Sequence, residues 1–212
     1  MSEDYSRQNL LRSEILPFLI TITSLTAAGK TSLIEALKIK FASRNIEMNF
    51  TSAGEIMREL GKESGFTSIE AFSRHNRDHP EDGYDRRCDD RVREIGKKDY
   101  QVIEGRLPHI FVPKGFHILL RCPLDVRAWR RYEYQNPDDL SLNEVMWKIV
   151  QRDEDDQARY KSLYSGCIWA EYDYDLIIDS SSMTVDEEVR AIIRGWKKWL
   201  ARNSWLVRCP CP

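Results

Sequence analysis

The run Ser24-Leu25-Thr26-Ala27-Ala28-Gly29-Lys30-Thr31 has the spacing of a loop that binds phosphate. In the pattern G-x-x-x-x-G-K-[ST], backbone N–H groups at a helix N-terminus surround the phosphates of a nucleotide. Lys30 would neutralise the β- and γ-phosphates, and the Thr31 hydroxyl would bind Mg²⁺. Ser24 stands where the pattern has glycine, which is acceptable if that position does not need a positive φ. The plain alternative is an ordinary strand-to-helix turn with a solvated lysine.

Two further segments carry groups suited to phosphate and metal. Glu104-Gly105-Arg106 follows the apolar run of residues 100–103, and a carboxylate there could hold water on Mg²⁺ while Arg106 reaches phosphate. Arg58, one turn into a helix that starts near residue 54, could bind a second phosphate. A structural Glu–Arg pair and an exposed helical arginine are the corresponding alternatives.

Arginines recur at helical spacing in the second half of the chain. Arg127, Arg130 and Arg131 lie at i, i+3 and i+4, so they share one helix face, and three like charges repel unless an anion lies between them. Arg152, Asp156 and Arg159 in "RDEDDQARY" lie at i, i+4 and i+7, so they also share one helix face. There the carboxylate could accept from the amino group of a base while the arginine binds phosphate, or the two could form a plain salt bridge.

The elements that must position these residues alternate between strand and helix. Short apolar runs predict strands over 18–23, 46–52, 100–105, 116–121 and 174–180. Helices are expected over 31–43, 53–98 with a break at 77–83, 123–135, 141–163 and 184–200, the last with Thr184 and Glu187 as a capping box. This alternation predicts an α/β fold with a parallel sheet, whose ligands bind beyond the carboxyl ends of the strands.

Composition limits the classes of function. Hydrophobic residues make up 42% and charged residues 31% of the 212 residues, as in a soluble protein with a real core. Because 32 cationic residues face 34 acidic ones, the chain lacks the overall basic charge of a protein that lives on nucleic acid. No run approaches the ~20 apolar residues of a membrane span. The N-terminus is too polar for a signal peptide, so we expect a cytoplasmic protein.

The five cysteines have spacings that favour neither a zinc site nor a disulfide framework. They are Cys88, Cys122, Cys167, Cys209 and Cys211. A reducing compartment is the simpler explanation.

Taken together, the motifs resemble those of the cytidylate kinase family, one of the nucleoside monophosphate kinase families. Their sequences are most similar to those of its archaeal-type members. The matching pieces are "ITITSLTAAGKTSL", "SAGEIMREL", "VIEGR", "PLDVRAWRR", "RDEDDQARY" and "DLIIDSSSMTVDEEV". The resemblance implies a P-loop kinase with a five-stranded parallel sheet flanked by helices. It also implies a helical acceptor-binding insert at about 53–98 and a lid at about 130–165, within a domain of residues 17–201. Residues 1–16 and 202–212 would be an N-terminal extension and a C-terminal tail.

The resemblance also implies roles for individual residues. Residues 27–32, which are Ala27, Ala28, Gly29, Lys30, Thr31 and Ser32, would bind ATP, with Thr31 and Glu104 at Mg²⁺. Lys30, Glu104 and the lid-side arginines Arg127, Arg130 and Arg131 would act in catalysis. Arg58 and Arg106 would bind the acceptor phosphate, and Asp156 and Arg159 would read cytosine and its phosphate. Ala53 stands where bacterial relatives have a base-contacting serine, so Ser52 is the candidate substitute.

The predicted function is ATP-dependent phosphoryl transfer to a pyrimidine nucleoside monophosphate, CMP or dCMP. Two other classes remain open from the sequence. One is a kinase of a hydroxyl on a modified pyrimidine, which could lie in DNA; it would need a general base. The other is a nucleotide-binding ATPase or regulator, which does not explain the "RDEDDQARY" set. Small nucleotides are the expected partners, nucleic acid is disfavoured but not excluded, and the oligomeric state is open.

Overall fold

The computed structural model describes residues 18–136, 139–164 and 170–203, and its centre is one parallel sheet. The five strands are β1 (Leu19–Ser24), β2 (Asn49–Ser52), β3 (Gln101–Gly105), β4 (Phe116–Arg121) and β5 (Leu176–Asp179). Their order is β2-β3-β1-β4-β5, and all four pairings are parallel. The predicted α/β fold class is therefore confirmed. All six residues of β1 are buried, so the segment after Ser24 leaves the sheet at the middle of its carboxyl edge.

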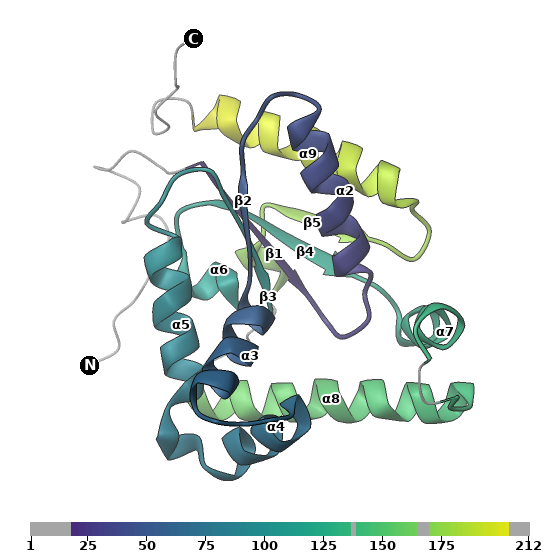
Figure 1. The fold of residues 1–212 in the computed structure, drawn as a ribbon. Coiled ribbons are helices and arrows are strands. Elements are labelled where there is room, and N and C mark those ends of the chain that lie inside the picture. Colours follow the sequence, from purple (N-terminus) through teal and green to yellow (C-terminus); the bar gives the residue numbers. More distant parts are fainter. Residues whose placement is uncertain (1–17, 137–138, 165–169, 204–212) are drawn as a thin grey trace.

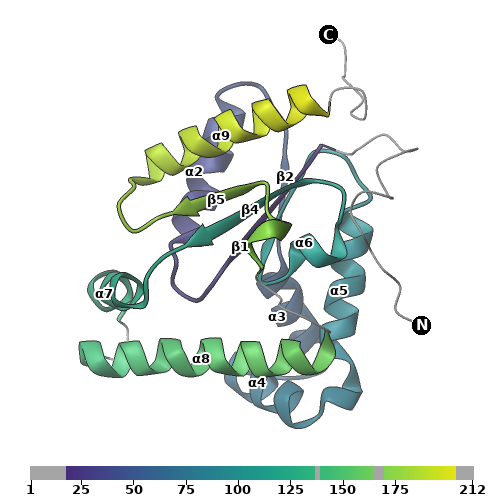
Figure 2. The same ribbon diagram turned by 180° about the vertical axis from the view of Figure 1, so that it is seen from behind.

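Helices cover both faces of the sheet (Figures 1 and 2). On one face, α2 (Lys30–Ala42) and α9 (Val185–Arg202) pack together, and their apolar residues include Leu37, Phe41 and Trp196. On the other face lie α5 (Tyr84–Ile95) and the short α6 (Pro108–Phe111), with Val92 and Phe111 in the core. A strand buried between two helical layers needs side chains that can be buried on both faces. Accordingly, β4 reads as a nearly continuous apolar run, and the polar residues of β1 are the small Thr21, Thr23 and Ser24.

The remaining helices gather beyond the carboxyl ends of the strands (Figure 1). They are α3 (Ala53–Glu63), α4 (Ile69–Asp78), the 3₁₀ turn η1 (Pro80–Asp82), α7 (Leu124–Tyr134) and α8 (Leu142–Leu163); a second 3₁₀ turn, η2 (Glu171–Asp173), precedes β5. The 22-residue α8 runs from α7 to the α3–α5 group. This helix therefore joins the two groups that flank the predicted loop.

Most predicted helix boundaries are confirmed to within a few residues. Pro123 is the N-cap of α7, and the capping box forms at α9, where the Thr184 backbone N–H donates to the Glu187 carboxylate at 2.8 Å. The second strand is shorter than predicted, because only residues 49–52 pair with β3. The expected tails lie outside the described residues, apart from 202 and 203.

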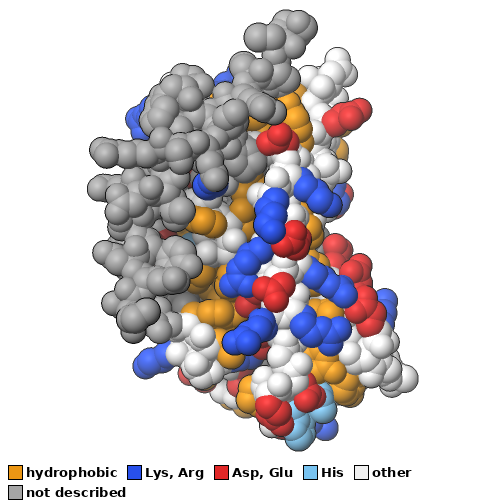
Figure 3. Space-filling view, turned by 90° about the vertical axis from the view of Figure 1, so that its left-hand side faces the viewer, with side chains coloured by type: hydrophobic (Ala, Val, Ile, Leu, Met, Phe, Trp, Pro, Cys, Tyr) orange, Lys and Arg blue, Asp and Glu red, His pale blue; other side chains and the backbone are white. Residues whose placement is uncertain are grey.

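The described surface bears on the expected partners. On the face that α5 occupies, cationic and acidic side chains are interspersed (Figure 3). Ion pairs such as Arg91–Glu63 and Arg93–Asp90 account for this pattern. This face has no continuous basic track for a nucleic-acid backbone. In the described part of the chain, no helix has the length and apolar character needed to cross a membrane.

Candidate active site

The loop between β1 and α2 has the conformation that phosphate binding needs. Ala27 (φ 60°) and Gly29 (φ 91°) are both left-handed, which turns the chain sharply before α2 begins at Lys30. Gly29 caps the helix without a side-chain hydrogen bond, so the N-terminus of α2 is open to an anion. Ser24 ends β1 in the extended conformation, so glycine's freedom is not required there.

Lys30 is paired with Glu104 across the neighbouring ends of β1 and β3. The two side chains are 20% and 16% exposed and form an ion pair. Burial lowers the pKa of Lys30, Glu104 opposes that effect, and the cations Arg106 and Arg152 add to it. Thr31, the next residue in the first turn of α2, is exposed.

Arg106 connects the loop to α8. Its guanidinium donates to the Ser24 carbonyl, to the Thr26 hydroxyl and, at 2.9 Å, to Asp156. The second oxygen of Asp156 accepts from Arg159, also at 2.9 Å. The structure therefore brings the predicted residues Arg106, Asp156 and Arg159 into one network beside the loop.

The three arginines of α7 have different environments. Arg127 is 5% exposed and donates to the Thr26 carbonyl at 2.8 Å and to Asp153 at 2.6 Å. Arg130 donates to the Ser180 carbonyl at 2.6 Å, beside the loop that follows β5. The Arg131 side chain makes no hydrogen bond or ion pair within the described ranges. Arg127 thus supports the loop through the Thr26 carbonyl, whereas Arg130 and Arg131 line the cavity beside the loop.

One residue that supports the loop, Asp153, was not singled out from the sequence. Asp153 accepts from Arg127 and from the Thr26 backbone N–H (3.1 Å), so it fixes the loop. Arg152 lines the cavity, and no described residue forms a hydrogen bond or ion pair with its side chain. Loss of water around it lowers its pKa, as do Arg106 and Arg131, whereas Asp156 raises it. The dense charge of "RDEDDQARY" was the available signal, but sequence alone does not rank its members.

Apart from Arg127 and Asp153, the charged side chains described above border one large cavity of about 1170 Å³. It extends from the loop 24–32 to α3, α4 and α5, and its wall includes Ser52 and Arg58. Ser52 is also the N-cap of α3, accepting from the Glu55 N–H at 3.2 Å, and Arg58 is half exposed. The volume exceeds the ~300–1,000 Å³ typical of a site for one small ligand.

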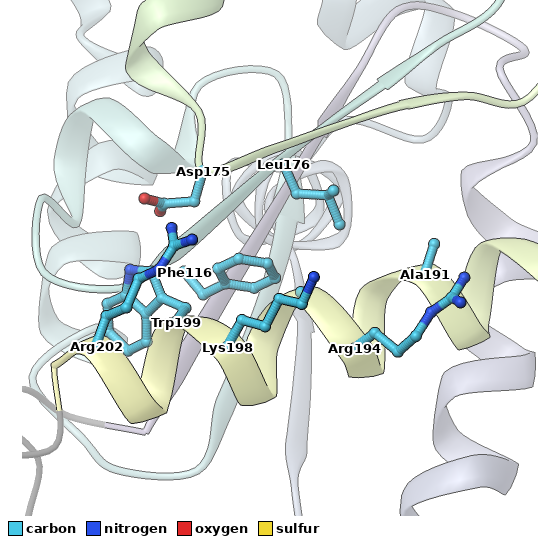
Figure 4. A pocket seen from close by; sticks show the side chains of 9 residues that line it. Phe116, Asp175, Leu176, Ala191, Arg194, Lys198, Trp199 and Arg202 are labelled. Atoms are coloured by element: carbon cyan, nitrogen blue, oxygen red, sulfur yellow. The ribbon is translucent and has the colours of Figure 1, made fainter.

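A second, smaller cavity of about 410 Å³ lies elsewhere, between α9 and the strands β4 and β5 (Figure 4). Phe116 and Leu176 begin those strands, so this cavity is at the amino edge of the sheet. Arg194, Lys198 and Arg202 line it from successive turns of α9. It is remote from the loop and contains none of the predicted site residues.

The described residues fit a magnesium–nucleotide complex better than a protein-enclosed metal ion. No group of three or more His, Cys, Asp or Glu side chains suited to a metal occurs among the residues that the structure describes. Mg²⁺ commonly takes one or two protein ligands and completes its shell with water and phosphate oxygens. Thr31 and Glu104 match that requirement.

Comparisons with known proteins identify the family of this chain. Residues 19–182 match the model of the cytidylate kinase-like family. Cytidylate kinase of Pyrococcus abyssi is 34% identical over 177 residues, covering 83% of this chain and 91% of the relative. That of Methanocaldococcus jannaschii is 32% identical over 174 residues, covering 79% and 91%.

Solved structures share the fold at low identity. A gluconokinase from Sinorhizobium meliloti has a TM-score of 0.55 at 13% identity, over 91% of this chain and 98% of that one. Shikimate kinase from Bacteroides thetaiotaomicron has a TM-score of 0.52 at 16% identity, over 83% and 96%. The chain belongs to the cytidylate kinase-like family and is a phosphotransferase of the nucleoside monophosphate kinase type.

Proposed function

We propose that this enzyme transfers the γ-phosphoryl group of ATP to CMP or dCMP. The observation that carries the proposal is the single cavity, with a phosphate-binding loop at one end, a helical pocket at the other and cationic side chains between them. The relatives named cytidylate kinase support a cytosine nucleotide as acceptor. Small nucleotides in the cytosol are the proposed partners.

In the proposed arrangement, ATP lies on the loop and the N-terminus of α2. The backbone of residues 27–29 and the side chain of Lys30 bind the β- and γ-phosphates, and Ser32 contributes from the first turn of α2. Mg²⁺, held by Thr31 and through water by Glu104, would neutralise charge on the phosphate oxygens. Helices α3–α5 form the acceptor-binding insert, and α7 and α8 form the lid.

The chemical step is an in-line displacement. An anionic oxygen of the acceptor phosphate forms a bond to the γ-phosphorus while the bond to the β–γ bridging oxygen breaks, giving a nucleoside diphosphate and ADP. No general base is needed, because the attacking oxygen carries no proton that must be removed. Arg58 and Arg106 would orient the acceptor phosphate, and Arg130, Arg131 and Arg152 would stabilise the charge on the transferred group.

Arg127, Asp156 and Arg159 have supporting parts in this proposal. Arg127 positions the loop through Thr26 and Asp153. Asp156 positions Arg106 and Arg159, because each of its oxygens accepts from one of them. The prediction that Asp156 reads cytosine remains a prediction, and Asp156→Asn tests it.

The direct experiment measures kcat/KM for CMP, dCMP, UMP, dTMP and AMP with Mg²⁺-ATP, and identifies products by mass spectrometry. We expect CDP and dCDP to form fastest. Equal turnover of all five acceptors would refute the cytosine preference. Turnover of none, together with phosphorylation of a hydroxymethyl pyrimidine nucleotide or of DNA that contains it, would favour the hydroxyl-kinase class instead.

A further inference from the structure

The acceptor end of the cavity has apolar walls and a polar patch. Its walls include Met57 of α3, Phe72 of α4 and Val92 of α5, and Phe72 and Val92 are each 2% exposed. Asn76 of α4 and Asp85 of α5 line the same region, across from Arg159 of α8. Apolar walls with a few convergent polar groups are typical of a pocket for a heterocyclic base.

Asn76 is a buried amide with one unused acceptor. The residue is 2% exposed, and its Nδ2 donates to the Asp85 carboxylate at 3.0 Å. Because a carboxylate only accepts, this contact fixes the amide with Oδ1 as the remaining group. Oδ1 is buried and has no hydrogen-bond partner among the described residues. A buried unpaired acceptor of this kind costs about 1–3 kcal/mol, so it calls for a donor from a ligand.

Asp85 adds acceptor capacity beside it. Its side chain is 14% exposed, receives the Asn76 amide and lies 3.6 Å from the Arg159 guanidinium. A carboxylate offers about four acceptor positions, so these contacts leave some open. One turn further along α5, Asp89 accepts from the Tyr164 hydroxyl, and burial raises the pKa of Asp89 to about 7. The patch is thus rich in acceptors.

Asp156 shares the neighbour Arg159 with Asp85 but differs from it in its other contacts. Its two oxygens already accept from Arg106 and Arg159, and Arg106 is bonded to the phosphate-binding loop. Asp156 is therefore on the phosphate side of the cavity. Asp85 and Asn76 belong to the insert helices, where the base of an acceptor held by its phosphate would extend.

We infer that Asn76 Oδ1 and the Asp85 carboxylate accept the two hydrogens of the 4-amino group of cytosine. This inference rests on the proposed function. Uracil and thymine present a carbonyl oxygen at the same position, which would face these two acceptors. The insert, rather than α8, would then set the preference for cytosine.

The test compares CMP, UMP and the 5′-monophosphate of 2-pyrimidinone ribonucleoside, which lacks the 4-amino group. With wild type, UMP and the amino-deleted analogue should each lose roughly 10- to 100-fold in kcat/KM relative to CMP. Asp85→Asn should reduce the CMP-to-UMP ratio at least tenfold, because it replaces an acceptor with a group that can donate. Asp90→Asn is the matched control on α5, since Asp90 is exposed and bonds only Arg93 in the described chain.

The variant Asp156→Asn distinguishes Asp156 from Asp85 as the residue that recognises cytosine. It should lower kcat/KM for CMP and UMP by similar factors and keep their ratio. A collapsed ratio in Asp156→Asn with an unchanged ratio in Asp85→Asn would overturn the inference and assign reading to α8. The wild-type comparison with the amino-deleted analogue needs no variant, so a poorly folded Asp85→Asn does not block the test; full turnover of the analogue would overturn the inference.

Failure of the inference and failure of the function give different results. A wild type that phosphorylates CMP, while Asp85→Asn and Asn76→Ala keep its full preference over UMP, rejects the inference alone. A wild type that phosphorylates no nucleoside monophosphate rejects the proposed function and this inference together. Calorimetric binding of CMP and UMP to wild type and Asp85→Asn gives the same comparison without catalysis.

Discussion

At the residue scale, Lys30 holds a preorganised positive charge at the mouth of the loop. Its ion pair with Glu104 fixes the ammonium group before any substrate is bound. Charge placed in advance is effective in phosphoryl transfer, because nothing needs to reorganise as the transition state forms.

Lys30→Ala should lower kcat by about 10²–10³-fold while the protein stays folded. Steady-state kinetics with CMP and circular dichroism measure the two effects. Lys38→Ala on the same helix is the control, since Lys38 is exposed and pairs with Glu35. Near-normal turnover by a folded Lys30→Ala enzyme would remove the loop from the mechanism.

Arg127 and Asp153 form a buried support for the loop, and their side chains are 6% and 17% exposed. Asp153→Ala leaves the guanidinium buried without its counterion, which should lower the free energy of unfolding by about 3 kcal/mol. Asp155, also on α8, has a half-exposed carboxylate. Asp155→Ala should therefore change the free energy of unfolding by less than about 1 kcal/mol. Urea unfolding checks both, and equal effects would argue against a structural role for the pair.

From the sequence, the residues of the site could be predicted better than the contacts that they make with one another. Lys30, Thr31 and Glu104 could be predicted because they are tied to a local pattern at a strand end. The Arg127–Asp153 and Arg106–Asp156 contacts could not, since each bridges separate elements and depends on how α8 lies against the loop. Asn76 and Asp85 were missed because no local pattern sets the packing of α4 on α5.

At the element scale, the end of β3 and the start of α3 approach very closely. A Cβ at Gly105 would lie 2.9 Å from the Ala53 Cβ, so glycine is needed for this approach. Arg106 directly follows Gly105, and Arg58 lies in the helix that Ala53 begins. A displacement there would disturb the acceptor side more than the ATP side.

Gly105→Ala should destabilise the fold by about 1–3 kcal/mol and raise the KM for CMP more than the KM for ATP. The matched variant Gly105→Ala with Ala53→Gly restores the space and should recover most of both losses. Thermal unfolding and two-substrate kinetics measure the recovery. A double variant no better than Gly105→Ala alone would show that this contact is not the cause.

The strands and long helices could be predicted because their apolar periodicity is set locally. The exceptions have tertiary causes. Residues 46–48 look like strand but have no partner, because β3 pairs only with residues 49–52. Helix α6 is only four residues long, so its sequence shows no helical periodicity. Its position depends on packing against β1 and α5.

At the scale of the whole molecule, two carboxyl groups in the wall of the large cavity also affect the stability of the fold. Glu188 of α9 is 3% exposed and lies near Arg130. Burial raises the pKa of Glu188 to about 7, and Arg130 only partly opposes this. Asp89 is raised to about 7 as well, mainly by burial. Both groups therefore couple the protonation of the native state to the stability of the fold.

Such groups make the protein less stable as pH rises. In the unfolded chain a glutamic acid loses its proton near pH 4.3, whereas native Glu188 keeps it until about pH 7. Between these values the native state binds more protons than the unfolded state, so the free energy of unfolding falls as pH increases. The stabilisation is complete below the unfolded pKa and is lost as pH rises through about 7.

Glu188→Gln replaces the acid by a neutral group of the same shape and should remove its share of this slope, up to about 1.4 kcal/mol per pH unit. Urea unfolding from pH 5 to pH 8 provides the measurement, and Asp89→Asn should remove a second share. Glu133→Gln on the exposed side of α7 is the control, and its slope should match that of wild type. If Glu188→Gln kept the full slope, native Glu188 would already be ionised at pH 5. The negative charge of Glu188 would then offset that of Arg130, and the net positive charge facing the transferred phosphoryl group would be lower by one unit.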